Sequence, residues 1–184
     1  MDQHNQWLNA NKRNVNIASS YIQQNTTVWC PPPTNFFKCN VDAAVFRDPH
    51  RMGFGCIIRD SLGVFFSAVC GTFPGSFSST TAEALAIREA LKWIKDLNLT
   101  NVIVESDALI VVDALRTWFS DVSSLGLILE DCSLLASELH SCSFSFVRRS
   151  ANQSAHSLAR STGSLSDFDR RVLSQPFVFP SVIV

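Results

Sequence analysis

A single aspartate, Asp42, interrupts a long run of apolar and β-prone residues, and this position constrains the chain more than any other feature. The run extends over residues 36–46. Burying a carboxylate is costly unless something compensates it, and Asp is disfavoured inside strands. We therefore expect a polar site around Asp42, with the rest of the chain serving as its scaffold.

Length and composition indicate one folded domain with irregular ends. The chain has 184 residues, and 46% of them are hydrophobic, which is typical of a globular protein with a substantial core. The sequence predicts a polar leader or linker over residues 1–28, a domain over 29–163 and a C-terminal tail over 164–184. In the tail, the apolar residues 177–179 are expected to dock on the domain.

Charge and cysteine usage argue against several classes of protein. The formal net charge is −1, so no global basic field indicates nucleic-acid binding, although a local basic groove stays open. None of the six cysteines sits in a C-x-x-C pair, which argues against a structural zinc site. No apolar signal region and no membrane-spanning stretch occur in the sequence. We expect an intracellular protein, nuclear or cytoplasmic and not secreted, with no membrane partner.

Periodicity predicts three strands followed by alternating helices and strands. The first three strands, over residues 36–46, 53–60 and 64–73, are joined by short connections and should form an antiparallel meander. The later elements are expected in this order: helix 81–97, strand 102–104, helix 108–118, helix 125–139, strand 142–149 and helix 152–160. Because strands and helices alternate there, parallel pairing with a right-handed crossover follows. The fold class is α/β.

Glu83 lies near the middle of the apolar side of the first predicted helix, so its carboxylate should point toward the sheet. The alternative is a local role. Thr80 and Glu83 have the spacing of a capping box, in which Glu83 would satisfy only the start of the helix.

Asp107 follows the fourth predicted strand, where the chain passes into a helix. Ligands of open α/β sheets collect beyond the carboxyl ends of parallel strands, although a helix N-cap is the simpler alternative for Asp107 alone. Three converging carboxylates would raise one another's pKa values, and a cation relieves that conflict. Asp42, Glu83 and Asp107 together therefore predict a site for Mg²⁺ or Mn²⁺, which prefer oxygen ligands more strongly than Zn²⁺ does.

Five short stretches, in order, resemble the ribonuclease H family, specifically the type 1 domain of plant proteins related to retroelements and reverse transcriptases. They are FKCNVD at 37–42, GFGCIIRD at 53–60, TAEALA at 81–86, VESD at 104–107 and VRR with the following N-x-x-AHSLA at 147–159. Together with Trp29 the resemblance covers roughly residues 29–162. It implies a ribonuclease H-like fold: a five-stranded mixed sheet, three antiparallel strands then parallel ones, with helices on both faces.

The resemblance also implies hydrolysis of the RNA strand of an RNA–DNA hybrid by a monomer with two Mg²⁺ or Mn²⁺ ions, the hybrid being recognised by its shape, backbone and 2′-hydroxyls. Asp42, Glu83 and Asp107 fall where the first three catalytic carboxylates of the family lie. Arg148 and Arg149 are candidate phosphate contacts. Two arginines at a strand end are equally typical of an ordinary solvated surface.

The sequence departs from the family pattern in three places. His156 stands at the position of the fourth carboxylate; imidazole is a poorer Mg²⁺ ligand, but it can accept or relay a proton, and a plain surface role is the alternative. The loop before the last helix lacks the histidine of bacterial members, and no basic insertion separates the middle helices. Two hypotheses remain: a hybrid endonuclease weakened by the lost carboxylate, with His156 among its catalytic residues, or a degenerate module that binds nucleic acid or a protein.

Overall fold

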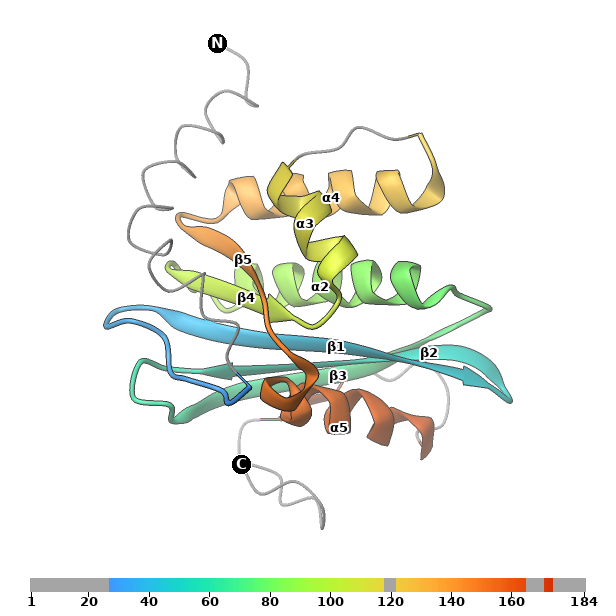
Figure 1. The fold of residues 1–184 in the computed structure, drawn as a ribbon, viewed down its shortest axis with the longest axis horizontal. Coiled ribbons are helices and arrows are strands. Elements are labelled where there is room, and N and C mark those ends of the chain that lie inside the picture. The colour runs from blue at the N-terminus through green and yellow to red at the C-terminus, as the bar shows by residue number, and fades with distance from the viewer. Residues whose placement is uncertain (1–26, 118–121, 165–170, 174–184) are drawn as a thin grey trace.

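The architecture, in a computed structural model of the chain, is a six-stranded mixed sheet with helices on both faces (Figure 1). The structure describes residues 27–117, 122–164 and 171–173. The strands are β1 (Phe37–Arg47), β2 (His50–Arg59), β3 (Phe65–Pro74), β4 (Val102–Ser106), β5 (Cys142–Phe146) and β6 (Arg171–Leu173). The helices are α2 (Ser79–Asp96), α3 (Leu109–Thr117), α4 (Ser124–Glu138) and α5 (Gln153–Ser161), with 3₁₀ turns at Arg149–Ala151 and Thr162–Ser164. The predicted α/β class is confirmed.

The first three strands form the antiparallel meander that the sequence predicts. Strands β1 and β2 pair from Lys38 opposite Arg59 as far as Arg47 opposite His50, so the turn between them is shorter than expected. Strand β3 pairs with β2 in the same antiparallel sense. These long strands give Asp42 a place in the middle of the sheet, opposite Gly55.

The next two strands add in parallel on the other side of β1, giving the order β5-β4-β1-β2-β3-β6. Asn40 of β1 lies opposite Glu105 of β4. Asp42 and Asp107 each follow this pair by two residues, so both leave the parallel pair at its carboxyl end. The edge of the sheet where the sequence places a ligand is therefore the edge at which these two carboxylates meet.

Helix α2 begins two residues earlier than predicted, and the capping-box interpretation of Glu83 is wrong. The N-cap is Ser78, whose hydroxyl oxygen accepts a hydrogen bond from the Thr81 N–H at 3.0 Å. Glu83 therefore sits in the second turn, beyond the cap. A cap supplied by Ser78 leaves the Glu83 carboxylate available for the sheet side of the helix.

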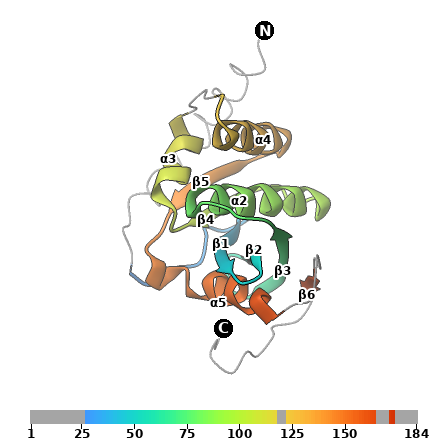
Figure 2. The same ribbon diagram turned by 90° about the vertical axis from the view of Figure 1, so that its right-hand side faces the viewer.

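The main core lies between the sheet and α2, α3 and α4, which cover one face together (Figure 2). Helix α2 is nearly buried on all sides because α4 packs on it from outside; its residues Leu91 and Ile94 are fully buried, as is Val41 of β1. Cysteines 39 and 56 are buried and pack as small apolar side chains. Among the described residues, no helix is long and apolar enough to cross a membrane.

Helix α5 covers the opposite face, against β1 and β2 (Figures 1 and 2). Gly55 makes this close approach possible. A Cβ added there would lie 2.5 Å from the backbone nitrogen of Ala159 and 2.8 Å from the carbonyl oxygen of Ala155, distances that real Cβ atoms essentially never show. The absent side chain lets α5 press on the strand beside Asp42, so residues of α5 come within reach of that carboxylate.

Two expectations at the C-terminal end need correction. The sheet has six strands rather than five, because residues 171–173 pair antiparallel with β3. The strand predicted over 142–149 stops at Phe146, since its partner β4 ends at Ser106, and Arg149 begins a 3₁₀ turn. The predicted docking of residues 177–179 lies outside the described residues, as does most of the predicted leader.

We expect Gly55→Ala to destabilise the protein by about 1–3 kcal/mol, the usual cost of overpacking a close interface. The added methyl group must push α5 away from β2. Thermal unfolding would show this as a melting temperature lower by several degrees. Leu62→Ala, at a side chain that is 83% exposed, is the control and should change little; an unchanged melting temperature for Gly55→Ala would contradict the packing described for α5.

Candidate active site

Three carboxylates from separate parts of the chain converge at the carboxyl end of β1 and β4. Asp42 comes from β1, Glu83 from α2 and Asp107 from the junction of β4 and α3, and one oxygen of each lies within 4.8 Å of the others. Asp42 is buried, whereas Glu83 and Asp107 are half-buried. The sequence-based expectation that these three side chains meet in space therefore holds.

The convergence is electrostatically unfavourable in the protein alone. Burial, reinforced by the nearby charges of Asp42 and Asp107, raises the pKa of Glu83 to about 9. Burial and the charge of Asp107 raise the pKa of Asp42 to about 6, although the neighbouring His156 lowers it in part. Without a cation, Glu83 would therefore hold a proton at neutral pH.

Glu83 shows the same imbalance in its hydrogen bonds. The backbone N–H of Ala43 favours its charged form, but its Oε2 atom is buried with no hydrogen-bond partner among the described residues. An unpartnered buried carboxylate oxygen is costly. Three carboxylates with one such oxygen form a donor set that suits an oxygen-seeking divalent cation such as Mg²⁺ or Mn²⁺.

His156 lies beside this cluster, on the first turns of α5. Its Nδ1 atom is 2.7 Å from Oδ2 of Asp42, while the side chain is only 22% exposed. Among the described residues, the ligand atoms that lie within 4.8 Å of one another belong to the three carboxylates and do not include His156. His156 therefore contacts the cluster through Asp42. The contact excludes a plain surface role for this histidine.

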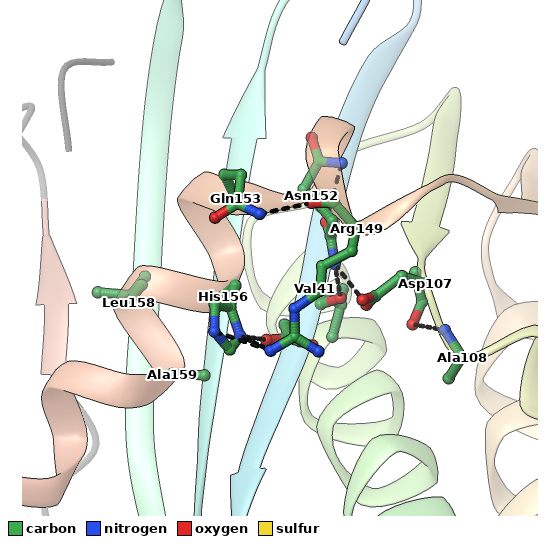
Figure 3. A network of polar contacts seen from close by, with 12 residues as sticks. Val41, Asp107, Ala108, Arg149, Asn152, Gln153, His156, Leu158 and Ala159 are labelled. Atoms are coloured by element: carbon green, nitrogen blue, oxygen red, sulfur yellow. Dashed lines mark hydrogen bonds and ion pairs between the residues drawn. The ribbon is translucent and has the colours of Figure 1, made fainter. Parts of the chain in front are cut away.

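Arg149, on the turn before α5, lies against His156. Its Nη2 atom is 2.9 Å from Nε2 and 3.3 Å from Nδ1 of the imidazole. The two ring nitrogens point in different directions, so an atom close to both cannot lie along the lone pair of either. The exposed guanidinium therefore rests on the ring (Figure 3). Arg148 is exposed at the start of the same turn.

Asn152 is a central residue of the site, although no sequence pattern predicted a role for it. Its side-chain NH₂ donates to the Val41 carbonyl at 2.9 Å and to Oδ1 of Asp107 at 3.0 Å, as Figure 3 shows. Its own oxygen accepts from Asn40 at 3.2 Å. Asn152 thus joins α5 to β1 and to the loop after β4, and its bond to Asp107 gives that carboxylate a role beyond a helix cap.

A buried ion pair continues this network. Lys38 and Glu105 are 2.8 Å apart and both nearly inaccessible to solvent, and Glu105 also accepts from Asn40 at 3.0 Å. Burial raises the pKa of Glu105, opposed by Lys38, Asn40 and Arg59. The two-residue periodicity of the strands could have predicted this network. Lys38, Asn40 and Asp42 share one face of β1, and Glu105 precedes Asp107 by two residues.

Comparison with known families gives a match over most of the domain. Residues 40–162 match the family described as reverse transcriptase-like. An Arabidopsis thaliana protein provisionally named a ribonuclease H protein is 28% identical over 141 residues, or 75% of this chain. The chain spans about a fifth of that protein, since the match covers 22% of its length.

Several solved ribonucleases H have the same fold. RNase H1 of the halophilic archaeon Halobacterium salinarum superposes with a TM-score of 0.63 at 20% identity, covering 69% of this chain and 96% of that one. The N-terminal RNase H domain of a Mycobacterium tuberculosis protein gives 0.61 at 18% identity, covering 69% and 92%. LC11-RNase H1, solved in complex with an RNA/DNA hybrid, gives 0.61 at 18%, covering 68% and 94%. The chain therefore belongs to the reverse transcriptase-like family and has the ribonuclease H fold.

Proposed function

We propose that the domain is a metal-dependent endonuclease that hydrolyses the RNA strand of RNA–DNA hybrids. The family and the fold support a nuclease of this class. The observation that carries the proposal is the convergence of Asp42, Glu83 and Asp107 within 4.8 Å. Without a cation, mutual repulsion and desolvation of these carboxylates would destabilise the folded state, and nothing would compensate for it.

The three carboxylates are arranged to leave oxygens for a cation. His156 contacts Oδ2 of Asp42, and Asn152 donates to Oδ1 of Asp107. Each of these carboxylates is thus held through one oxygen, and its second oxygen can bind an ion. Glu83 adds an oxygen that has no hydrogen-bond partner among the described residues. Mg²⁺ or Mn²⁺ bound here, as two ions with substrate present, would activate a water molecule and stabilise the charge of the scissile phosphate.

His156 and Arg149 would serve the substrate beside the carboxylates. The exposed Arg149 guanidinium can donate hydrogen bonds to a backbone phosphate, which arginine recognises well. The imidazole of His156, already in contact with Asp42, can accept or relay a proton. Arg148, exposed on the same turn, is a further candidate for phosphate contact.

A degenerate binding module is the second candidate function. The observation that favours it is the contact of His156 with Asp42, because an imidazole at this point uses a carboxylate oxygen that a second cation would otherwise bind. The net charge of −1 also gives weak electrostatic attraction to a nucleic acid. The two candidates differ in one measurable property, which is cleavage of a bound hybrid.

We expect the protein to cleave a labelled RNA–DNA hybrid with Mg²⁺ or Mn²⁺. Asp42→Asn should lower the rate by a factor on the order of 10² or more, because it weakens the binding of a cation that stabilises the transition state by several kcal/mol. Gel analysis of the RNA products measures this. Asp113→Asn, at an exposed helical site, is the matched control. Hybrid binding without cleavage, in the wild type as in Asp42→Asn, would contradict the enzyme and favour the binding module.

Restoring a carboxylate at the fourth position should strengthen the activity. We expect His156→Asp to raise the Mg²⁺-supported cleavage rate by about tenfold, since a carboxylate is a better Mg²⁺ ligand than an imidazole and even the outer partners of metal ligands change affinity or activity by 10–100-fold. Steady-state rates at several Mg²⁺ concentrations test this. His140→Asp makes the same change at an exposed position that follows α4. A large loss of activity in His156→Asp would instead assign the imidazole an indispensable role.

Stability should depend on pH and on metal. The folded-state pKa values of Asp42 and Glu83, about 6 and about 9, lie above the unfolded values near 4. The folded state therefore binds more protons, and in EDTA the melting temperature should fall as pH rises from about 4 to about 9. Mn²⁺ at pH 8 should raise it again by binding the native state.

Glu83→Gln provides the matched variant for this pH dependence. It removes the titrating group that has the highest pKa in the cluster, so in EDTA it should flatten the decline and melt higher than the wild type at pH 8. It should also reduce the shift caused by Mn²⁺. Glu130→Gln, on the exposed side of α4, is the control. Identical pH curves for wild type and Glu83→Gln in EDTA would show that Glu83 is not held in an unfavourable environment.

A further inference from the structure

We infer that Glu105, Asn40 and Asn152 form a buried positioning chain that fixes the orientation of the Asp107 carboxylate for cation binding. The inference rests on the proposed function only in taking Asp107 as a metal ligand. Asn152 contacts the Asp107 carboxylate directly. Glu105 and Asn40 act on it only through Asn152. The chain connects the ion pair at one end of the site to a carboxylate at the other.

The contacts run without a gap from one strand to the next. Lys38 lies 2.8 Å from Oε1 of Glu105, and Oε2 of the same carboxylate accepts from Asn40 at 3.0 Å. The second N–H of the Asn40 amide reaches the Asn152 oxygen at 3.2 Å. The Asn152 amide then donates to Asp107 at 3.0 Å.

The hydrogen-bonding capacities fix the direction of every amide along this chain. Lysine can only donate and an ionised carboxylate can only accept, so Glu105 must receive the NH₂ of Asn40. In that orientation the second N–H of Asn40 faces Asn152, which must therefore accept the hydrogen bond with its side-chain oxygen. The NH₂ of Asn152 is then left to face Asp107 and the Val41 carbonyl, both acceptors.

Burial makes this order hard to replace by water. Asn40 and Asn152 are each 1% exposed and Glu105 is 5% exposed. Oδ1 of Asn40 is also buried with no hydrogen-bond partner among the described residues. An arrangement selected for stability alone would satisfy that oxygen or replace the amide by an apolar side chain. A network that accepts this cost while ending on a candidate ligand fits a role in ligand orientation.

The chain should therefore control metal affinity more than fold stability. Outer hydrogen-bond partners of metal ligands typically contribute 10–100-fold to affinity. Replacing a buried ion pair by neutral or apolar residues, by contrast, is often harmless to stability. These two expectations separate a positioning role from a merely structural one.

The test uses two double variants that differ only in an acceptor for Asn40. In Lys38→Met/Glu105→Gln the ion pair is gone, yet the glutamine oxygen can still accept from Asn40. In Lys38→Met/Glu105→Leu the ion pair and the acceptor are both gone. Isothermal titration of the full chain with Mn²⁺, without nucleic acid, gives the dissociation constant, and thermal unfolding in EDTA gives the stability of each variant.

We expect the glutamine variant to bind Mn²⁺ within about threefold of the wild type and the leucine variant to bind about tenfold or more weakly, at similar melting temperatures in EDTA. Asn152→Ala, which removes the last link directly, should weaken Mn²⁺ binding to the same extent and provides the answer if the leucine variant fails to fold. Equal Mn²⁺ affinity in the wild type, the leucine variant and Asn152→Ala would overturn the inference. Absence of Mn²⁺ binding by the wild type would instead overturn the metal centre of the proposed function, and the inference with it.

Discussion

The repulsion among three partly buried carboxylates is the constraint on which the rest of this structure depends. Asp42, Glu83 and Asp107 bring carboxyl oxygens within 4.8 Å of one another, and burial raises the pKa values of Asp42 and Glu83. A small domain has little stability to spare for such an arrangement. The long meander, the parallel pair β1–β4 and the helix α2 hold the three groups in place, and a divalent cation would turn their repulsion into attraction.

Helix α5 provides the second half of the site. Its close position on the sheet depends on a residue of β2 that has no side chain, Gly55. Gly55 lets the helix lie directly on β2, with Asn152 at its start and His156 one turn later. Asn152 donates a hydrogen bond to Oδ1 of Asp107, and His156 contacts Oδ2 of Asp42. Backbone contact at a glycine thus determines how carboxylates on other strands are oriented.

The site departs from the ribonuclease H resemblance at one position. His156 places an imidazole next to Asp42, at the position where the ribonuclease H resemblance implies a fourth carboxylate, and the Arg149 guanidinium lies against that imidazole. Such groups favour anions rather than a second cation, and a phosphate oxygen is an anion that the substrate would supply. In the proposed nuclease, a histidine at this position would therefore be compatible with catalysis and would change which charges of the protein face the nucleic acid.

Periodicity along the chain was enough to predict the order of the elements from β1 to α5, because such patterns are local. The same patterns placed Asp42 inside a strand, Glu83 on the sheet side of a helix and Asp107 after a strand. Local reasoning misplaced the start of α2, because the capping-box spacing of Thr80 and Glu83 coexists with a real cap at Ser78. It also failed at residues 171–173, whose pairing partner is distant in sequence. It gave no role to Asn152, whose partners come from β1 and from the β4–α3 junction.

The sequence by itself determined which residues could form strands and helices and which acidic side chains faced the same way, since periodicity of 2 and 3.6 residues is written in the chain. Only the tertiary structure decided what those side chains meet. The contact of His156 with Asp42 and the hydrogen-bond chain from Glu105 to Asp107 join segments up to 114 residues apart. Such contacts depend on register and on helix packing, which no local pattern specifies.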